Sequence, residues 1–302
     1  MNRAILARWA RHLPALLYSR DCAAFLSFVP LGHYYSPIPS SKDIRKHRDR
    51  LFDRSALQVP GVCTDLSEQI ILLQSFAEFH QDWPFSEKPK QGLRFYDRND
   101  YCENGDSFVL YSMLRRHKPQ RVIEVGSGFS SALMLDTNEL FLSSKTKFTF
   151  VEPNPNRLYG LLRKEDYASC AVIREPVQNV PLVPFQDLGA GDILFIDSSH
   201  VARIGSDVVH MLTHVLPALQ KGVLVHIHDI PWPFEYPEAW LKGGRAWNEA
   251  YMVKAFLQYN AAFKIVLFNG FVGQHASPIQ RESFHPTFKR DCGTSLWLEK
   301  VA

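Results

Sequence analysis

From residue 121 onward, short apolar runs alternate with segments in which the apolar residues have helical spacing. The runs at 192–197 and 222–229 are almost continuously apolar before they end in polar residues. Such runs are typical of strands that are buried on both faces, as in a parallel sheet covered by helices. The alternation therefore predicts a doubly wound α/β sheet. The expected strands are 121–125, 148–152, 170–175, 192–197 and 222–229.

Two further strand-like runs, 263–269 and 294–301, break this alternation near the end of the chain. The segment between them contains Pro278 and Pro286 and shows no good helical pattern. Without a crossover helix, two successive strands are most simply antiparallel. The sequence thus predicts a parallel sheet that is completed by a C-terminal antiparallel hairpin.

The part of the chain before residue 106 is expected to form a mainly helical extension. Residues 65–79 have apolar residues at helical spacing and start at a candidate cap, either Asp65 or Ser67. A further helix at 106–119 has Asp106 as its candidate cap. The first thirty residues carry four arginines and no acid before Asp21. This stretch is either a peripheral membrane-surface or targeting segment, or a helix that packs on the domain.

Composition excludes several classes of protein. The 302 residues include 34 Lys and Arg and 31 Asp and Glu, so the strong basic excess typical of nucleic-acid binders is missing. The five cysteines form no CxxC pair, which argues against a disulfide framework or a zinc ribbon and indicates a reducing, cytoplasmic compartment. No apolar stretch of about 18 residues is present, so a transmembrane span is not expected.

A glycine turn follows the first expected strand, in the stretch VIEVGSGFSS at 122–131. Gly126 and Gly128 let the backbone approach a ligand closely, and the following helix offers free N–H groups at its start. A dinucleotide would place its pyrophosphate near Glu124, which is an unfavourable like charge, and Ser131 stands where a third glycine is expected. S-adenosylmethionine carries an ammonium and a sulfonium group and no phosphate, so the charge of Glu124 favours it. The alternative is that Glu124 caps the loop or pairs with an arginine.

Two more residues are candidates for binding the nucleoside. Glu152 follows the second expected strand, and an acid at this position can accept both ribose hydroxyls of either cofactor. Gln178 follows the third expected strand, where it either bonds the adenine edge or is solvated.

Polar residues gather at the ends of the fourth and fifth expected strands. Asp197 and His200 follow one strand, and His226, His228 and Asp229 end the other. In open α/β sheets these ends face the ligand crevice, and the strand period of two places both histidines of the fifth strand on one face. Because such a cluster is costly to bury without a role, we predict that Asp197, His200 and His228 are catalytic.

Two chemistries remain open for this cluster. Asp197, His228 and Asp229 can converge on a divalent cation such as Mg²⁺ or Mn²⁺, which would lower the pKa of a substrate hydroxyl. Without a metal, His200 or His228 can act as a general base, since imidazole titrates near neutral pH. For any single histidine, a structural hydrogen bond is the simpler interpretation.

A Pro- and aromatic-rich stretch follows the fifth strand and is a poor helix. It is interpreted as a substrate lid beside the crevice. Trp247, in the helix expected after it, is assigned to the core. The expected walls of the lid are Trp232, Phe234, Tyr236 and Trp240.

The stretches VIEVGSGFSS, FVEPNP, GDILFIDSSH and GVLVHIHDIPWPFEYP, in this order, resemble a class I S-adenosylmethionine-dependent methyltransferase. The chain is most similar to the bacterial group described as family 24 methyltransferases, from about residue 32 to near its end. This resemblance implies a seven-stranded Rossmann-like sheet with a final antiparallel hairpin. Metal-dependent catechol-type relatives have an aspartate after the fourth strand, which Asp197 matches, and Asp-Asn after the fifth, from which His228-Asp229 departs. The residues implied to line the methionine side of the cofactor are Glu124, Gly126, Ser127 and Gly128, with Glu152 on the ribose.

We therefore expect an enzyme that methylates a small-molecule or glycan-like acceptor at oxygen, by in-line transfer from S-adenosylmethionine. Asp197 is counted with the cofactor-binding residues as well as with the catalytic ones. Residues 106–302 are expected to form the cofactor-binding domain, and residues 1–105 an extension that covers the active site. An NAD(P)-dependent oxidoreductase and a non-catalytic binding protein on a methyltransferase fold remain as alternatives.

Overall fold

Two compact units, residues 1–53 and 54–302, make up the chain in a computed structural model that describes residues 28–302. The described part of the first unit carries two short helices, α3 (Ser41–Lys46) and α4 (Arg48–Leu51). The interpretations of the basic N-terminal stretch fall on residues 1–27, which lie outside the described residues.

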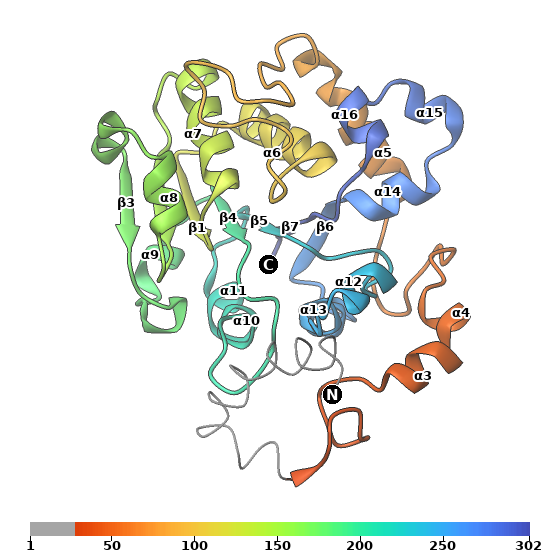
Figure 1. Cartoon of the computed structure of the whole chain (residues 1–302). Coiled ribbons are helices and arrows are strands. Elements are labelled where there is room, and N and C mark those ends of the chain that lie inside the picture. Colours follow the sequence, from red (N-terminus) through yellow and green to blue (C-terminus); the bar gives the residue numbers. More distant parts are fainter. Residues whose placement is uncertain (1–27) are drawn as a thin grey trace, which may run out of the picture. The chain divides into compact units, whose positions relative to one another are not determined.

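A seven-stranded sheet forms the centre of the second unit, in the order β3-β2-β1-β4-β5-β7-β6 (Figure 1). The first five strands are parallel, and β7 pairs antiparallel with both β5 and β6. This arrangement confirms the predicted doubly wound sheet with its C-terminal antiparallel hairpin. The strands are β1 (Arg121–Val125), β2 (Lys147–Val151), β3 (Cys170–Ile173), β4 (Ile193–Ile196), β5 (Leu224–Ile227), β6 (Phe263–Phe268) and β7 (Leu296–Lys300).

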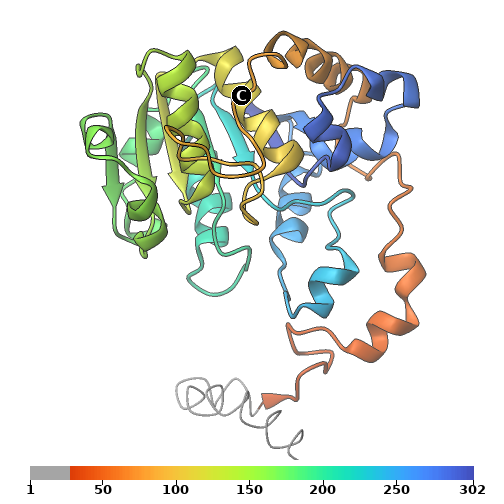
Figure 2. The ribbon, with the colours of Figure 1, turned by 45° about the horizontal axis from the view of Figure 1, so that its top comes forward.

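Helices cover both faces of the sheet, and each face has its own hydrophobic core (Figure 1 and Figure 2). Because side chains alternate along a strand, Val122 packs into one core and Ile123 into the other. The same alternation separates Phe195 from Ile196 on β4. The central parallel strands β1, β4 and β5 are thus buried on both faces, which explains their nearly continuous apolar sequences.

Helices α5, α6 and α7 pack into the Val122 core, and α10, α11 and α13 pack into the Ile123 core. No helix in the described part of the chain is both long and apolar enough to span a membrane. The helical segments of the second unit are α5 (Leu66–Ser75), η2 (Phe76–Phe79), α6 (Asn104–His117), α7 (Phe129–Phe141), α8 (Asn156–Leu161), η3 (Lys164–Ala168), η4 (Val177–Asn179), α9 (Val183–Gln186), α10 (Asp207–His210), η5 (Met211–Val215), α11 (Leu216–Ala218), α12 (Glu238–Lys242), α13 (Glu249–Leu257), α14 (Asn269–His275), α15 (Pro278–Glu282) and α16 (Pro286–Arg290).

Two predictions about the helices of the second unit are wrong. Asp106 lies within the first turn of α6 instead of capping it, and its carboxylate accepts hydrogen bonds from the backbone N–H groups of Thr294 at 3.0 Å and Ser295 at 2.8 Å. The segment between β6 and β7 is not irregular, because it forms α14, α15 and α16. Pro278 and Pro286 each occupy the first position of a helix, where the missing N–H leaves no hydrogen bond unmade.

Candidate functional site

The strand order reverses between β1 and β4, and ligands bind at such switch points in open α/β sheets. Backbone hydrogen bonds align the strand ends there. The N–H of Asp197 donates to the Val125 carbonyl at 2.9 Å, and the N–H of His228 donates to the Ile196 carbonyl at 2.9 Å. The polar residues after β4 and β5 therefore lie beside the glycine turn after β1, as the parallel register predicts.

A cavity of about 350 Å³ opens at these strand ends. Its volume lies within the range of about 300–1,000 Å³ that is usual for small-molecule sites. Among the residues that the structure describes, Glu124 and Gln178 are the two candidate site residues that do not line it. The candidates that do are Gly126, Ser127, Gly128, Glu152, Asp197, His200, His228 and Asp229.

Glycine is favoured at the two positions of the turn for different physical reasons. Gly126 has φ +83°, and a Cβ there would lie 1.7 Å from the carbonyl oxygen of Asp197. Gly128 has an extended backbone, and a Cβ there would meet the flexible side chain of Arg157 at 3.1 Å. The first glycine is thus required by the fold, whereas the second keeps the cavity wall free of a side chain.

Glu124 lies fully buried beneath this turn. Its carboxylate accepts hydrogen bonds from the hydroxyl groups of Ser130, at 2.5 Å, and of Ser131. Burial raises the pKa of Glu124 to about 8, although the serine hydroxyls act in the opposite direction. The side chain therefore fixes the start of α7, which corresponds to the loop-capping alternative that the sequence left open.

Glu152 directly follows β2 and supports the turn from the side of the cavity. Its carboxylate oxygens accept hydrogen bonds from the backbone N–H groups of Ser127 at 3.2 Å and Asn154 at 2.8 Å. A carboxylate has about four acceptor positions, so Glu152 can still accept hydroxyl groups of a ligand. Gln178 donates from Nε2 to the Gly205 carbonyl at 2.6 Å.

His200 is held between carboxylates from three elements. Its Nδ1 lies 2.8 Å from Oε2 of Glu249, and its Nε2 lies 3.3 Å from Asp197 Oδ1 and 3.8 Å from Asp229 Oδ2. Burial lowers the pKa of His200, but its contacts with Asp197 and Glu249 outweigh this and raise the pKa to about 10. The ring is therefore an imidazolium at neutral pH, which favours an orienting role over that of a general base.

His228 also lines the cavity, close to Asp229. Its Nε2 is 3.9 Å from Oδ1 of Asp229 and 3.4 Å from the Tyr101 carbonyl. Burial lowers the pKa of His228, but Asp197 and Asp229 together raise it to about 9. This histidine is therefore also cationic at neutral pH and offsets the charge of the two aspartates.

His226 faces the same side of β5 but does not line the cavity. Its Nε2 lies 2.8 Å from Ser295 Oγ, and its ring stacks on Phe195 with the centroids 3.9 Å apart. Burial lowers the pKa of His226 well below its usual value. The structural interpretation thus holds for His226, whereas His200 and His228 reach the cavity.

The predicted metal ligands are not arranged as a metal site. In the described part of the chain, no three His, Cys, Asp or Glu side chains are placed so that they could hold a metal ion. His200 Nε2 lies 3.3 Å from Asp197 Oδ1 and 3.8 Å from Asp229 Oδ2. The imidazolium of His200 therefore offsets the charge of these carboxylates, for which a metal ion was one of the two chemistries that the sequence left open.

Several residues that complete this site were not predicted from the sequence. Glu249 belongs to no recognisable sequence motif. It is the first residue of α13, and its exposed fraction is only 2%. Arg157 and Arg245 line the cavity and stack over aromatic rings instead of pairing with described carboxylates. For Arg245, the sequence offers one indication of a binding role: the arginine lies two positions before an aromatic residue, Trp247.

The prediction of an aromatic substrate lid is wrong for three of its four residues. Trp232, Phe234 and Tyr236 are at most 3% exposed and belong to the Ile123 core, where the rings of Trp232 and Phe234 pack against Phe268 of β6. Trp247, which was assigned to the core, lines the cavity, with its ring centroid 4.4 Å from that of His200.

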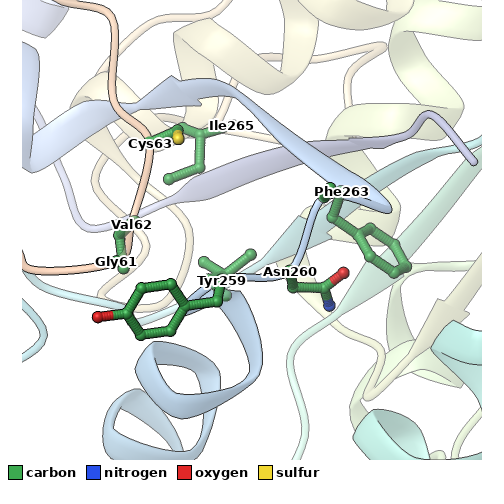
Figure 3. Close-up of a pocket in the computed structure, with 9 residues that line it drawn as sticks. Gly61, Val62, Cys63, Tyr259, Asn260, Phe263 and Ile265 are labelled. Carbon is green, nitrogen blue, oxygen red and sulfur yellow. The ribbon is translucent and has the colours of Figure 1, made fainter.

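A second cavity, of about 340 Å³, lies between the end of α13 and the edge strand β6 (Figure 3). Tyr259 bounds it, and its backbone N–H donates to the Gly61 carbonyl at 2.7 Å. The described residues that line it include no Asp, Glu, Lys, Arg or His. It therefore lacks the charged and titratable acid or imidazole groups that gather at the switch point, and the cavity at the switch point is the candidate active site.

Residues 123–230, which include the glycine turn and the strands β4 and β5, match a family model described as a methyltransferase domain. An uncharacterized protein of Archaeoglobus fulgidus is 31% identical over 164 residues, which cover 53% of this chain and 73% of that protein.

Solved structures of low sequence identity are also similar in part. The methyltransferase PaMTH1 of Podospora anserina, bound to S-adenosylhomocysteine, is 13% identical, with 87% of this chain and 96% of that chain covered and a TM-score of 0.42. The O-methyltransferase TomG of Streptomyces achromogenes, in complex with S-adenosylmethionine, is 11% identical, with 86% and 96% covered and a TM-score of 0.39.

Proposed function

This chain belongs to the class I S-adenosylmethionine-dependent methyltransferases of the family 24 type, and on that premise we propose that it methylates an oxygen atom of a small-molecule or glycan-like acceptor. The observation that carries the proposal is a single cavity that joins the Gly126 turn to the polar ends of β4 and β5. A cofactor held at the turn and an acceptor held at the strand ends would meet within it. The lining residues Asp100 and Tyr101 support the view that the segment before residue 106 forms part of the cover.

The donor groups of the turn fit an S-adenosylmethionine molecule. Ser127 Oγ is a buried polar atom that has no hydrogen-bond partner among the described residues, so a bound ligand could satisfy it. Glu152 keeps free acceptor positions for a ribose, and Gly128 leaves room beside it. Asp197, whose negative charge is only partly exposed, provides a favourable environment for a sulfonium cation.

The cofactor supplies an electrophilic methyl group: the acceptor oxygen bonds to this carbon while the carbon–sulfur bond breaks and its electron pair stays on sulfur. The acceptor hydroxyl loses its proton in the same process. Asp197 and Asp229 are the cavity-lining carboxylates that can accept that proton and pass it to solvent. The cationic rings of His200 and His228 hold the two carboxylates in place, so the acceptor oxygen can be aligned with the methyl group.

Burial and the two neighbouring histidines shift the pKa of Asp197 in opposite directions. Burial raises the pKa of Asp197, but the positive charges of His228 and His200 outweigh it and leave the pKa below its usual value. A weak base is consistent with catalysis that depends more on alignment than on proton abstraction. The acceptor hydroxyl therefore needs to be acidic or to transfer its proton late.

The test is a calorimetric titration of the purified chain with S-adenosylhomocysteine and, separately, with NAD⁺, followed by an assay of methyl transfer from labelled S-adenosylmethionine to a panel of hydroxy compounds. We expect binding of the sulfur nucleoside, no binding of the dinucleotide, and labelled product with at least one acceptor. Asp197→Asn should lower the turnover while it retains cofactor binding within a few fold. Binding without transfer to any acceptor would instead favour a non-catalytic binding protein, and binding of NAD⁺ alone would overturn the assignment.

A further inference from the structure

We propose that the acceptor carries an anionic group, a carboxylate or a phosphate, and that Arg245 binds it. This inference rests on the proposed function, because it assigns the substrate side of the same cavity. Arg245 lies in the loop between α12 and α13, and its guanidinium lies over the rings of Trp240 and Trp247, 5.5 Å and 5.3 Å from their centroids. Among the described residues, no carboxylate forms an ion pair with it.

The position of Arg245 relates it to the reacting end of the cavity. Trp247, two residues later, packs its ring 4.4 Å from that of His200. The backbone N–H groups of Asn248 and Glu249 both donate to the His200 carbonyl, at 3.1 Å and 3.2 Å. The loop that carries Arg245 is therefore fixed to the residue that orients the cavity carboxylates.

In the described part of the chain, no acid that lines the cavity forms an ion pair with Arg245, and most of these acids contact other groups. Asp197 contacts His200 and Asp229 lies near His228, whereas Asp100 lines the cavity without an ion pair among the described residues. Glu152 accepts hydrogen bonds from the glycine turn. These acids therefore do not offset the charge of Arg245. The N–H groups of its guanidinium remain available for an anion, and their fork-like geometry suits a carboxylate or a phosphate.

Arg157 is the second arginine of the cavity, and its position assigns it to the cofactor side. Its side chain lies beside Gly128, where a Cβ would meet Cδ of Arg157 at 3.1 Å, and its guanidinium lies 3.8 Å from the centroid of the Tyr101 ring. The carboxylate of a bound S-adenosylmethionine molecule can form an ion pair with the guanidinium group of Arg157. One arginine then serves the anion of the cofactor, and Arg245 serves that of the acceptor.

The inference is tested by calorimetry on the full chain saturated with S-adenosylhomocysteine. The probes are phenyl phosphate and benzoate, which differ in their anion, and neutral benzamide. We expect at least one anion to bind more tightly than benzamide, and the better one identifies the preferred group. Arg245→Gln should weaken that anion about tenfold, as expected for loss of a charge-assisted hydrogen bond, and Arg245→Lys should restore part of the affinity.

Two further variants make the result specific. Arg116→Gln, on the exposed end of α6, removes the same charge away from the cavity and should leave the anion affinity unchanged. Arg157→Gln should weaken S-adenosylhomocysteine more than either anion. The inference is overturned if benzamide binds as well as both anions, if neither anion binds at millimolar concentration, or if Arg245→Gln has no effect. Failure of the unsubstituted chain to bind S-adenosylhomocysteine would overturn the proposed function instead.

Discussion

Gly126 and Asp197 are in such close contact that a single carbon atom added to the glycine would lie 1.7 Å from the aspartate carbonyl oxygen. The turn after β1 thus fits tightly against the chain that leaves β4. The backbone N–H of Asp197 in turn donates to Val125, the residue before the glycine, at 2.9 Å. The glycine turn and Asp197 therefore form one closely packed backbone unit.

Gly126→Ala is expected to destabilise the fold by about 3–5 kcal/mol, because it combines an unfavourable positive φ with a backbone clash. Gly128→Ala is the matched control, since its backbone is extended and its new Cβ meets only a flexible side chain. Gly128→Ala should change the free energy of unfolding by less than about 1 kcal/mol but weaken S-adenosylhomocysteine about tenfold, through intrusion into the cavity. Urea denaturation and calorimetry measure the two effects. Equal stability losses in both variants would contradict this division of roles.

Glu124 should make stability fall as the pH rises. Its pKa is raised from 4.5 to about 8 in the folded chain, so the fold favours the protonated form. This contribution is fully present below about pH 4.5 and is lost as the pH rises through 8. Glu124→Gln removes the titration, and the difference between the two unfolding free energies should change by up to about 1.4 kcal/mol per pH unit in this window. Parallel pH curves for the two proteins would show that Glu124 keeps its ordinary pKa.

Residues at strand ends could be located from the sequence, because strand period and parallel register depend on local patterns. Asp197, His200 and His228 accordingly come together as predicted. The direction of the Glu124 side chain could not be predicted, since it depends on whether the hydroxyls of α7 or the ligand are nearer. Glu249 was missed for a similar reason: it lies 49 positions after His200 in the sequence, and the two residues meet only once the intervening chain has folded.

Glu249→Gln is expected to lower the turnover about tenfold to a hundredfold, less than the loss of a group that transfers the proton itself. The amide keeps the volume but removes a charge that stabilises the imidazolium of His200, so the ring would orient Asp197 less firmly. The KM for the cofactor should change little, because Glu249 does not line the cavity.

The measurement is a pH profile of turnover, with Glu165→Gln on the exposed surface as the control. A purely structural role for Glu249 would lower the unfolding midpoint without moving the pH profile. We expect the alkaline limb of the profile to shift towards lower pH in Glu249→Gln, because His200 would lose its proton more easily.

Arg94 joins three parts of the second unit that are distant in sequence. Its side chain is 2% exposed and lies 2.6 Å from Asp136 on α7, 2.6 Å from Asp166 in η3 and 2.5 Å from Glu139. The same Asp136 accepts hydrogen bonds from the backbone N–H groups of Arg94, at 2.7 Å, and Phe95, at 2.8 Å. The segment before α6 is thus fixed to α7, whose first turn lines the cofactor cavity.

Arg94→Met should lower the free energy of unfolding by about 3–5 kcal/mol, because it leaves buried carboxylates without their cation. Arg98→Met provides the control: its pair with Glu87 is 3.5 Å long and more than half exposed on both sides, so a loss of at most about 1 kcal/mol is expected. Urea denaturation of the three proteins measures these differences. A loss in Arg94→Met no larger than in Arg98→Met would show that the buried cluster adds nothing beyond a surface pair, and that the attachment of this segment to α7 depends on its apolar contacts alone.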